Sequence, residues 1–123
     1  MSDPALVREL LRQVLLATDT ILERFKPVHT AKDFAATQAG REKMDSICMQ
    51  LIVLGEGLKN LDKVTGGGLL VRYPGVDWKK AMGLQDIISH AYPSVDPDVI
   101  FQVCRTRVPP LRDLLKRILE EAP

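Results

Sequence analysis

The stretch Met44–Leu61, MDSICMQLIVLGEGLKNL, decides the fold class. Its apolar residues recur at intervals of three and four, which is the spacing of one face of an α-helix. Between positions 49 and 54 they occupy more than one side of that helix, so we expect it to be the central and most buried one. Gly55 and Gly57 each lower the helix propensity by about 1 kcal/mol. A close helix crossing would explain both, because a missing side chain lets another backbone approach.

An amphipathic helix precedes this stretch. Asp3-Pro4 is typical of a helix start, since Asp caps free amides and Pro suits the first turn. Apolar residues at three- and four-residue spacing then predict about six turns, and Pro27 ends the helix. We interpret residues 30–38 as a connector with room for one short helical turn, and the central helix begins near Thr37.

Residues 64–75 form the one long break in the pattern. Gly66-Gly67-Gly68 does not favour a phosphate-binding loop, because the G-x-x-x-x-G-K-[S/T] spacing and a preceding strand are both missing. Asp77 then caps a third helix, which Pro93 ends. The residues predicted on its apolar side are Ala81, Leu84, Ile87 and Ile88.

The last helical segment starts at Asp96-Pro97 and its apolar pattern reaches Ile118. Pro109-Pro110 must break or kink it, and the pattern leaves open whether the helix is split or only bent. No segment has the two-residue period of a strand. We therefore predict an all-α fold, an antiparallel bundle of four to five helices, as a single domain over residues 1–123.

Composition excludes several classes of protein. The formal net charge is +1, from 17 Lys and Arg against 16 Asp and Glu, so any polyanion site must be local. Cys48 and Cys104 lie in apolar helical patterns and are expected to be buried, reduced thiols. Without a Cys/His cluster we expect no metal site. Charges at Arg8, Glu9 and Arg12 argue against a secretory leader, and no apolar run nears the roughly 18 residues of a membrane span, so we expect a cytoplasmic protein.

His90 is the leading candidate for chemistry. It stands at a predicted helix C-terminus, where the helix dipole favours a cation, and an imidazole changes charge near neutral pH. His29, in the connector, is expected to be a solvated loop residue.

The segment Tyr73–Tyr92, YPGVDWKKAMGLQDIISHAY, holds the most informative motifs. Gly55-Glu56-Gly57 precedes it, and Val95-Asp96 and Val108-Pro109-Pro110-Leu111 follow it. In this order and spacing the chain resembles the HepT-like branch of the HEPN superfamily. Members of that branch show Gly-Glu-Ala, Tyr-Pro-x-x-x-Trp, Gly-Met-Arg-Asn-x-x-x-His-x-Tyr, Val-Asp and Leu-Pro-x-Leu in turn.

The resemblance implies a HEPN-like homodimer that acts as a metal-independent endoribonuclease without a cofactor. It also implies the toxin component of a toxin–antitoxin system, paired with a minimal nucleotidyltransferase antitoxin. In the family, Arg and His of an Arg-x4–6-His motif line a cleft between protomers. Here His90 and Tyr92 match that motif, Gln85 stands in place of the Arg and Asp86 in place of the Asn. The resemblance further implies that Tyr92 accepts a nucleotidyl group, whose phosphate beside His90 would repel RNA.

The departure at Gln85 weakens the expected site. Metal-free RNA cleavage uses the ribose 2′-OH as nucleophile, so the protein must move protons, a task for His90, and stabilise charge on a phosphate. Gln85 loses the positive charge of an arginine, and losing one stabilising donor typically lowers the rate by about 10²–10³-fold. Asp86 adds a negative charge where RNA would approach.

Two hypotheses remain open. Another arginine supplies the charge, and the candidates are Arg72, Arg105 and Arg107. Alternatively, the chain is a catalytically degenerate member that binds a nucleotidyltransferase partner or a nucleotide without cleaving RNA. Gln85 and His90 also lie about 140° apart around one helix, so a cleft at a two-fold axis suits the site better than a single protomer.

Structural roles are expected for three other residues of the motif. Glu56 could face the cleft or the solvent, and of its roles we favour a hydrogen bond accepted from the third helix. Tyr73 and Trp78 are expected to pack the start of that helix. The basic residues between Arg105 and Arg117 fit a solvated face at least as well as an RNA track.

Overall fold

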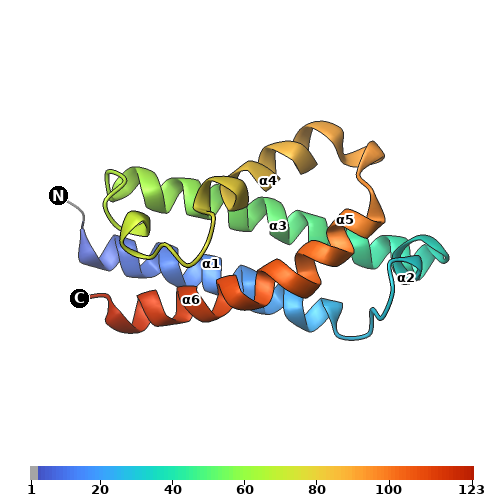
Figure 1. Ribbon diagram of the computed structural model, residues 1–123, viewed down its shortest axis with the longest axis horizontal. Helices are drawn as coiled ribbons and strands as arrows, with labels where there is room; N and C mark the ends of the chain where they lie inside the picture. The colour runs from blue at the N-terminus through green and yellow to red at the C-terminus, as the bar shows by residue number, and fades with distance from the viewer. Residues whose placement is uncertain (1–2) are drawn as a thin grey trace.

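The long helices lie side by side, and successive ones run in opposite directions along the molecule (Figure 1). The computed structural model describes residues 3–123. Its helices are α1 (Pro4–Phe25), α2 (Lys32–Ala35), α3 (Gln38–Val64), α4 (Trp78–Ala91), α5 (Pro97–Gln102) and α6 (Val108–Glu121). Short 3₁₀ turns at Leu70–Arg72 and Tyr92–Ser94 and a π-helical turn at Val103–Arg107 connect them. With α5 and α6 forming one column, the predicted all-α antiparallel bundle is confirmed.

Side-chain caps begin four of the helices at the predicted positions. A cap matters because the first backbone N–H groups of a helix have no partner within it. The capping residues are Asp3, Thr37, Asp77 and Asp96, which accept hydrogen bonds at 2.9–3.0 Å from the N–H groups of Ala5, Gly40, Lys80 and Asp98.

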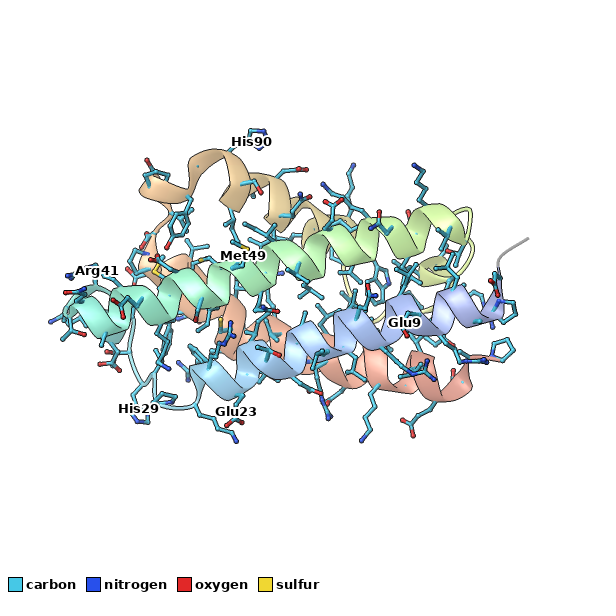
Figure 2. The ribbon with its side chains drawn as sticks, turned by 180° about the vertical axis from the view of Figure 1, so that it is seen from behind. Glu9, Glu23, His29, Arg41, Met49 and His90 are labelled. Atoms are coloured by element: carbon cyan, nitrogen blue, oxygen red, sulfur yellow. The ribbon has the colours of Figure 1, made fainter. Side chains whose placement is uncertain are left out.

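Helix α3 is the centre of the bundle, as predicted, and contacts α1, α4 and α2. Its fully buried residues include Ile47, Leu58 and Leu61. Within the stretch 49–54, expected to be the most buried, Met49 and Val53 are nevertheless 58% and 44% exposed. Neighbouring helices cover α3 on its other sides, and Met49 lies on the face that none of them covers (Figure 2).

Both glycines of α3 mark close crossings, as predicted. A Cβ atom on Gly55 would lie 2.5 Å from Cβ of Gln85 in α4, and one on Gly57 would lie 2.5 Å from Cγ1 of Val14 in α1. Ordinary carbon contacts are about 3.5–4.0 Å. The two glycines therefore set how closely α4 and α1 approach α3.

The α5–α6 column is bent rather than split at its two prolines. The N–H of Val108 donates to the carbonyl of Val103, five residues back, in the π-helical turn. Pro109 and Pro110 then fall in the first turn of α6, where a missing N–H leaves no bond unmade. Cys104 in this turn and Cys48 in α3 are buried, free thiols, as predicted, and burial raises the pKa of each to about 12.

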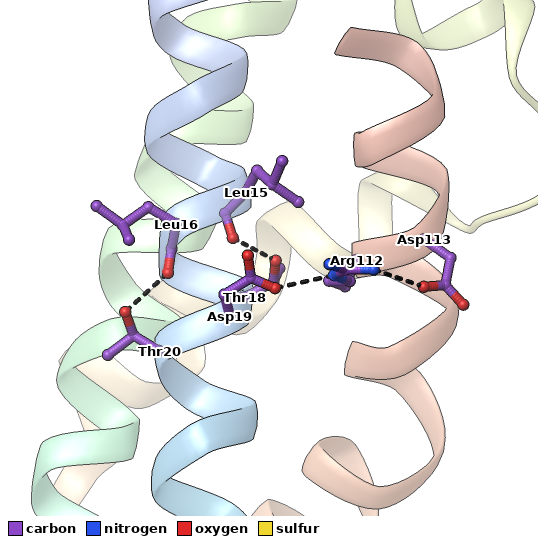
Figure 3. A network of polar contacts seen from close by, with 7 residues as sticks. All are labelled: Leu15, Leu16, Thr18, Asp19, Thr20, Arg112 and Asp113. Carbon is purple, nitrogen blue, oxygen red and sulfur yellow. Dashed lines mark hydrogen bonds and ion pairs between the residues drawn. The ribbon is translucent and has the colours of Figure 1, made fainter. Parts of the chain in front are cut away.

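Helices α1 and α6 are joined at their surface by Arg112 (Figure 3). Its guanidinium donates to Asp19 at 2.8 Å and to Asp113 at 3.3 Å. Beside it the fully buried hydroxyl of Thr18 donates to the carbonyl of Leu15 at 2.7 Å. That buried group is therefore satisfied, while the exposed ion pairs contribute little to stability.

Helix α4 packs on α3 but leaves a hollow of about 680 Å³ between itself and the α5–α6 column. Leu54 lines this hollow from α3, and Leu84 from α4. Ile87, predicted on the apolar side of this helix, lines the hollow but is 61% exposed, whereas Ile88 is fully buried. Among residues 3–123 no helix has both the length and the apolar character needed to cross a membrane.

Candidate functional site

His90 lies in the last turn of α4, exposed and directed away from the bundle (Figure 2). Its Nδ1 atom is 2.8 Å from the backbone carbonyl oxygen of Asp86. Because a carbonyl can only accept, Nδ1 must carry the hydrogen. The neutral ring therefore presents the lone pair of Nε2 to solvent, where it can take a proton.

Gln85 and Asp86 share one partner, the ammonium group of Lys59 in α3. Lys59 Nζ donates to Oε1 of Gln85 and lies 3.0 and 3.1 Å from the two carboxylate oxygens of Asp86. The negative charge of Asp86 is therefore paired with this ammonium group. Sequence reasoning did not single out Lys59, although it lies one helical turn from Gly55, where α4 crosses α3.

Gln85 and His90 are not brought together within one chain. Gln85 is half-buried, its Cβ against Gly55, whereas His90 points to solvent. Asp86 links the two indirectly. Its side chain shares the partner Lys59 with Gln85, and its backbone carbonyl accepts from the His90 ring. Asp86 and His90, four residues apart, share one face of the helix.

Tyr92 begins the 3₁₀ turn that follows α4 and is half-buried. Its hydroxyl donates to a carboxylate oxygen of Asp45 in α3, a partner that sequence reasoning missed. Tyr92 and Asp45 line a shallow hollow that also contains Arg41. This hydrogen bond connects the turn after α4 to α3, two residues after His90.

The three candidate arginines are all exposed. Arg72 precedes α4. Hydrogen bonds from Tyr73 and Arg117 hold the pKa of Glu121 below its ordinary range, and the charge of Arg72 adds a smaller effect in the same direction. The 14 residues of α4 span about 20 Å and separate Arg72 from His90. Arg105 and Arg107 lie in the π-helical turn, where Arg107 lines the hollow facing α4.

The expectations for the remaining motif residues have mixed outcomes. Trp78 and Tyr73 are buried at the start of α4, as predicted, and Trp78 Nε1 donates to the carbonyl of Tyr73 at 2.8 Å. The expectation for Glu56 is wrong, because it is exposed and Lys59 makes the described link to α4 instead. His29 is exposed, as expected.

No group of three or more His, Cys, Asp or Glu side chains placed to hold one metal ion occurs in residues 3–123.

The sequence motifs predict a helical bundle of the HepT-like class. The structure agrees, because the bundle presents an exposed histidine, His90, and the nearby Tyr92 at the end of α4. The model of the family described as ribonuclease HepT-like matches residues 18–118. The chain therefore belongs to the HepT-like ribonuclease family, and the resemblance noted in the sequence is confirmed. Family membership supports an RNase-type function.

Two relatives agree with this assignment. A protein of Caldanaerobacter subterraneus subsp. tengcongensis, named as a candidate RNase, is 26% identical over 117 residues, which are 93% of this chain and 95% of the relative. A protein of Methanocaldococcus jannaschii, named as a gamma-glutamylcyclotransferase and candidate RNase, is 23% identical over 107 residues. That match spans 87% of this chain but 45% of the longer relative. No solved structure matches the chain.

Proposed function

We propose that this protein is a HepT-like toxin, an endoribonuclease that cleaves RNA without a metal ion at a cleft between two protomers. The observation that carries the proposal is the geometry of His90, whose Nδ1–H is held by the Asp86 carbonyl so that Nε2 is the free, basic nitrogen. Family membership supplies the reaction class.

The chemistry requires one proton to leave and one to arrive. The 2′-hydroxyl of a ribose loses its proton and attacks the adjacent phosphorus, which expels the 5′-oxygen of the next nucleotide. The products are a 2′,3′-cyclic phosphate and a 5′-hydroxyl. Nε2 of His90 takes the first proton or, when protonated, supplies the second. A two-fold axis near this helix end would bring two copies of His90 to one cleft, one for each transfer.

The test is expression in bacteria without any partner protein. Growth arrest is expected from the natural chain and from His29→Ala, which changes the other histidine, exposed in the loop after α1. His90→Ala should abolish the arrest. The proposal fails if the natural chain neither arrests growth nor cleaves RNA when purified.

We propose a minimal nucleotidyltransferase as the antitoxin, acting in the cytoplasm on Tyr92. The Tyr92 hydroxyl donates to Asp45. Attack of its oxygen on the α-phosphorus of ATP would release pyrophosphate, replace that hydrogen with AMP and set a phosphate beside the Asp45 carboxylate. The added charge near His90 would also repel RNA.

Mass spectrometry with the partner and ATP tests this step. One AMP should be added to the natural chain and to Tyr73→Phe, whereas Tyr92→Phe should remain unmodified. Unchanged labelling of Tyr92→Phe would contradict the assignment.

A second candidate function rests on the absence of an arginine at position 85. In this hypothesis the chain binds a nucleotidyltransferase or a nucleotide but does not cleave RNA. Gln85→Arg separates the two hypotheses. Cleavage that appears only in Gln85→Arg identifies a lapsed enzyme, whereas cleavage by the natural chain excludes this candidate.

A further inference from the structure

Lys59 joins α3 to the part of α4 that carries Gln85 and Asp86 through hydrogen bonds and an ion pair. It lies one turn after Gly55, on the same face of α3. At Gly55 the two helices are so close that a Cβ atom would meet Gln85 Cβ at 2.5 Å. The close crossing lets the four-carbon side chain of Lys59 reach across and place its ammonium group at the surface of α4.

The ammonium group is held by two acceptors of different kinds. Gln85 accepts through its neutral carboxamide oxygen and Asp86 through its carboxylate. The side chain of Lys59 is 36% exposed and that of Asp86 is 58% exposed. The cation is therefore positioned yet open to solvent, and the carboxylate beside it is exposed enough to be displaced by another anion.

Asp86 connects this cation to the histidine. Asp86 and His90 are four residues apart on one helix face, where such neighbours have Cβ atoms about 5–6 Å apart. Lys59 meets the side chain of Asp86, and the His90 ring meets its carbonyl. One phosphodiester group can thus have an oxygen at the ammonium while a ribose or leaving oxygen faces Nε2.

We propose that Lys59 supplies the fixed positive charge that an arginine at position 85 supplies elsewhere in the family, and that it binds the RNA phosphate. Gln85 is then a positioning residue, because it holds Lys59 without neutralising it. Asp86 is the resting partner that the phosphate replaces. The inference also explains the departure at position 85, since an arginine there would face the ammonium of Lys59 and be repelled. The inference rests on the proposed ribonuclease function and assigns the residue of that site that binds the phosphate of the RNA substrate.

Cleavage of a fluorescent RNA in EDTA, followed under single-turnover conditions, tests the inference. Lys59→Met should lower the rate on the order of 10²-fold, the effect of removing one charged stabilising donor. Lys59→Arg keeps the charge and should retain most of the rate. The double variant Lys59→Met with Gln85→Arg moves the charge to the family position and should recover much of the loss. Lys63→Met, exposed and one turn further along α3, is the matched control and should cleave like the natural chain.

RNA binding gives a second readout that does not depend on turnover. Lys59→Met should weaken binding and lower the slope of log K against log salt by about 0.7–1, the loss of one phosphate contact. Asp86→Asn should strengthen binding, because the ammonium loses its competing carboxylate. Circular dichroism of each variant verifies that it folds, and the double variant tests the charge if Lys59→Met alone does not fold.

The outcomes separate this inference from the proposed function. If the natural chain cleaves, His90→Ala does not, and Lys59→Met cleaves at the natural rate, the role of Lys59 is overturned and the ribonuclease stands. If neither the natural chain nor any variant cleaves, the ribonuclease proposal fails. The RNA-binding measurements then test whether Lys59 contacts the phosphate. Equal RNA affinity and salt slope for Lys59→Met and Lys63→Met would then overturn it.

Discussion

Replacing Gly55 with alanine inserts one methyl group between α3 and α4 at their closest approach. The new carbon would lie 2.5 Å from Gln85 Cβ and 3.4 Å from its Cα and backbone nitrogen. Because carbon atoms in ordinary contact are about 3.5–4.0 Å apart, α4 must move by about 1 Å. The side chain of Gln85 cannot relieve the contact by rotating, since Cβ itself and the backbone are the atoms struck.

The expected magnitude follows from two opposing effects. Overpacking a tight contact typically costs about 1–3 kcal/mol, and alanine in place of glycine stabilises a helix by about 1 kcal/mol. The free energy of unfolding should therefore fall by about 0–2 kcal/mol. Gly83 in α4 is a matched control, because a Cβ atom there meets nothing within 4 Å. Gly83→Ala should raise stability by about 0.5–1 kcal/mol.

Urea unfolding followed by circular dichroism at the helical band measures both variants. The Gly83→Ala protein should be the more stable of the two by about 0.5–3 kcal/mol. Equal stability of the two variants would refute the close crossing. Gly57→Ala provides an intermediate case, since it strikes only the Cγ1 methyl of Val14, which is the end of a side chain.

Three other variants test separate parts of the bundle. Since the pKa of Cys48 and Cys104 rises from 9.0 to about 12 on folding, the unfolded chain releases these protons first. Stability should then fall between pH 9 and pH 12 by about 1.4 kcal/mol per pH unit for each thiol, and the double alanine variant should lack that slope in urea titrations. Trp78→Phe loses a buried hydrogen bond and should lower the free energy of unfolding by about 1–3 kcal/mol; no change would show that this bond does not matter. Arg112→Ala breaks an exposed pair with Asp19 and should lower the melting temperature only slightly, less still in high salt; a large, salt-independent loss would contradict the surface role.

Features set by local chemistry were predictable from the sequence. The helix starts follow from capping side chains such as Asp77, whose oxygen accepts an amide hydrogen that the helix leaves free. Pro109-Pro110 fits the first turn of a helix, which is where α6 begins, although the sequence left open whether the last helix is split or bent. Gly55 and Gly57 indicated close crossings because glycine within a helix is unfavourable unless another backbone needs the space.

Features set by the packing of one helix against another were not predictable in the same way. Ile87 has the right spacing for burial, but the α5–α6 column stands away from α4 and leaves that residue at the edge of a hollow. Lys59 and Asp45 are the partners of the site residues Asp86 and Tyr92. Which residues of α3 become partners depends on how α4 is rotated on α3. A periodic pattern identifies a face of a helix but does not say which charged residue of a neighbour lies opposite it. The spacing of Lys59 from Gly55 was the available signal.

The central claim is that His90 cleaves RNA in this protein. The most direct measurement is incubation of the purified chain with tRNA in EDTA, followed by analysis of the new RNA ends. We expect ends carrying 2′,3′-cyclic phosphate from the natural chain and from His29→Ala, and none from His90→Ala. Cleavage by His90→Ala at the natural rate, or no cleavage by the natural chain, would contradict the account.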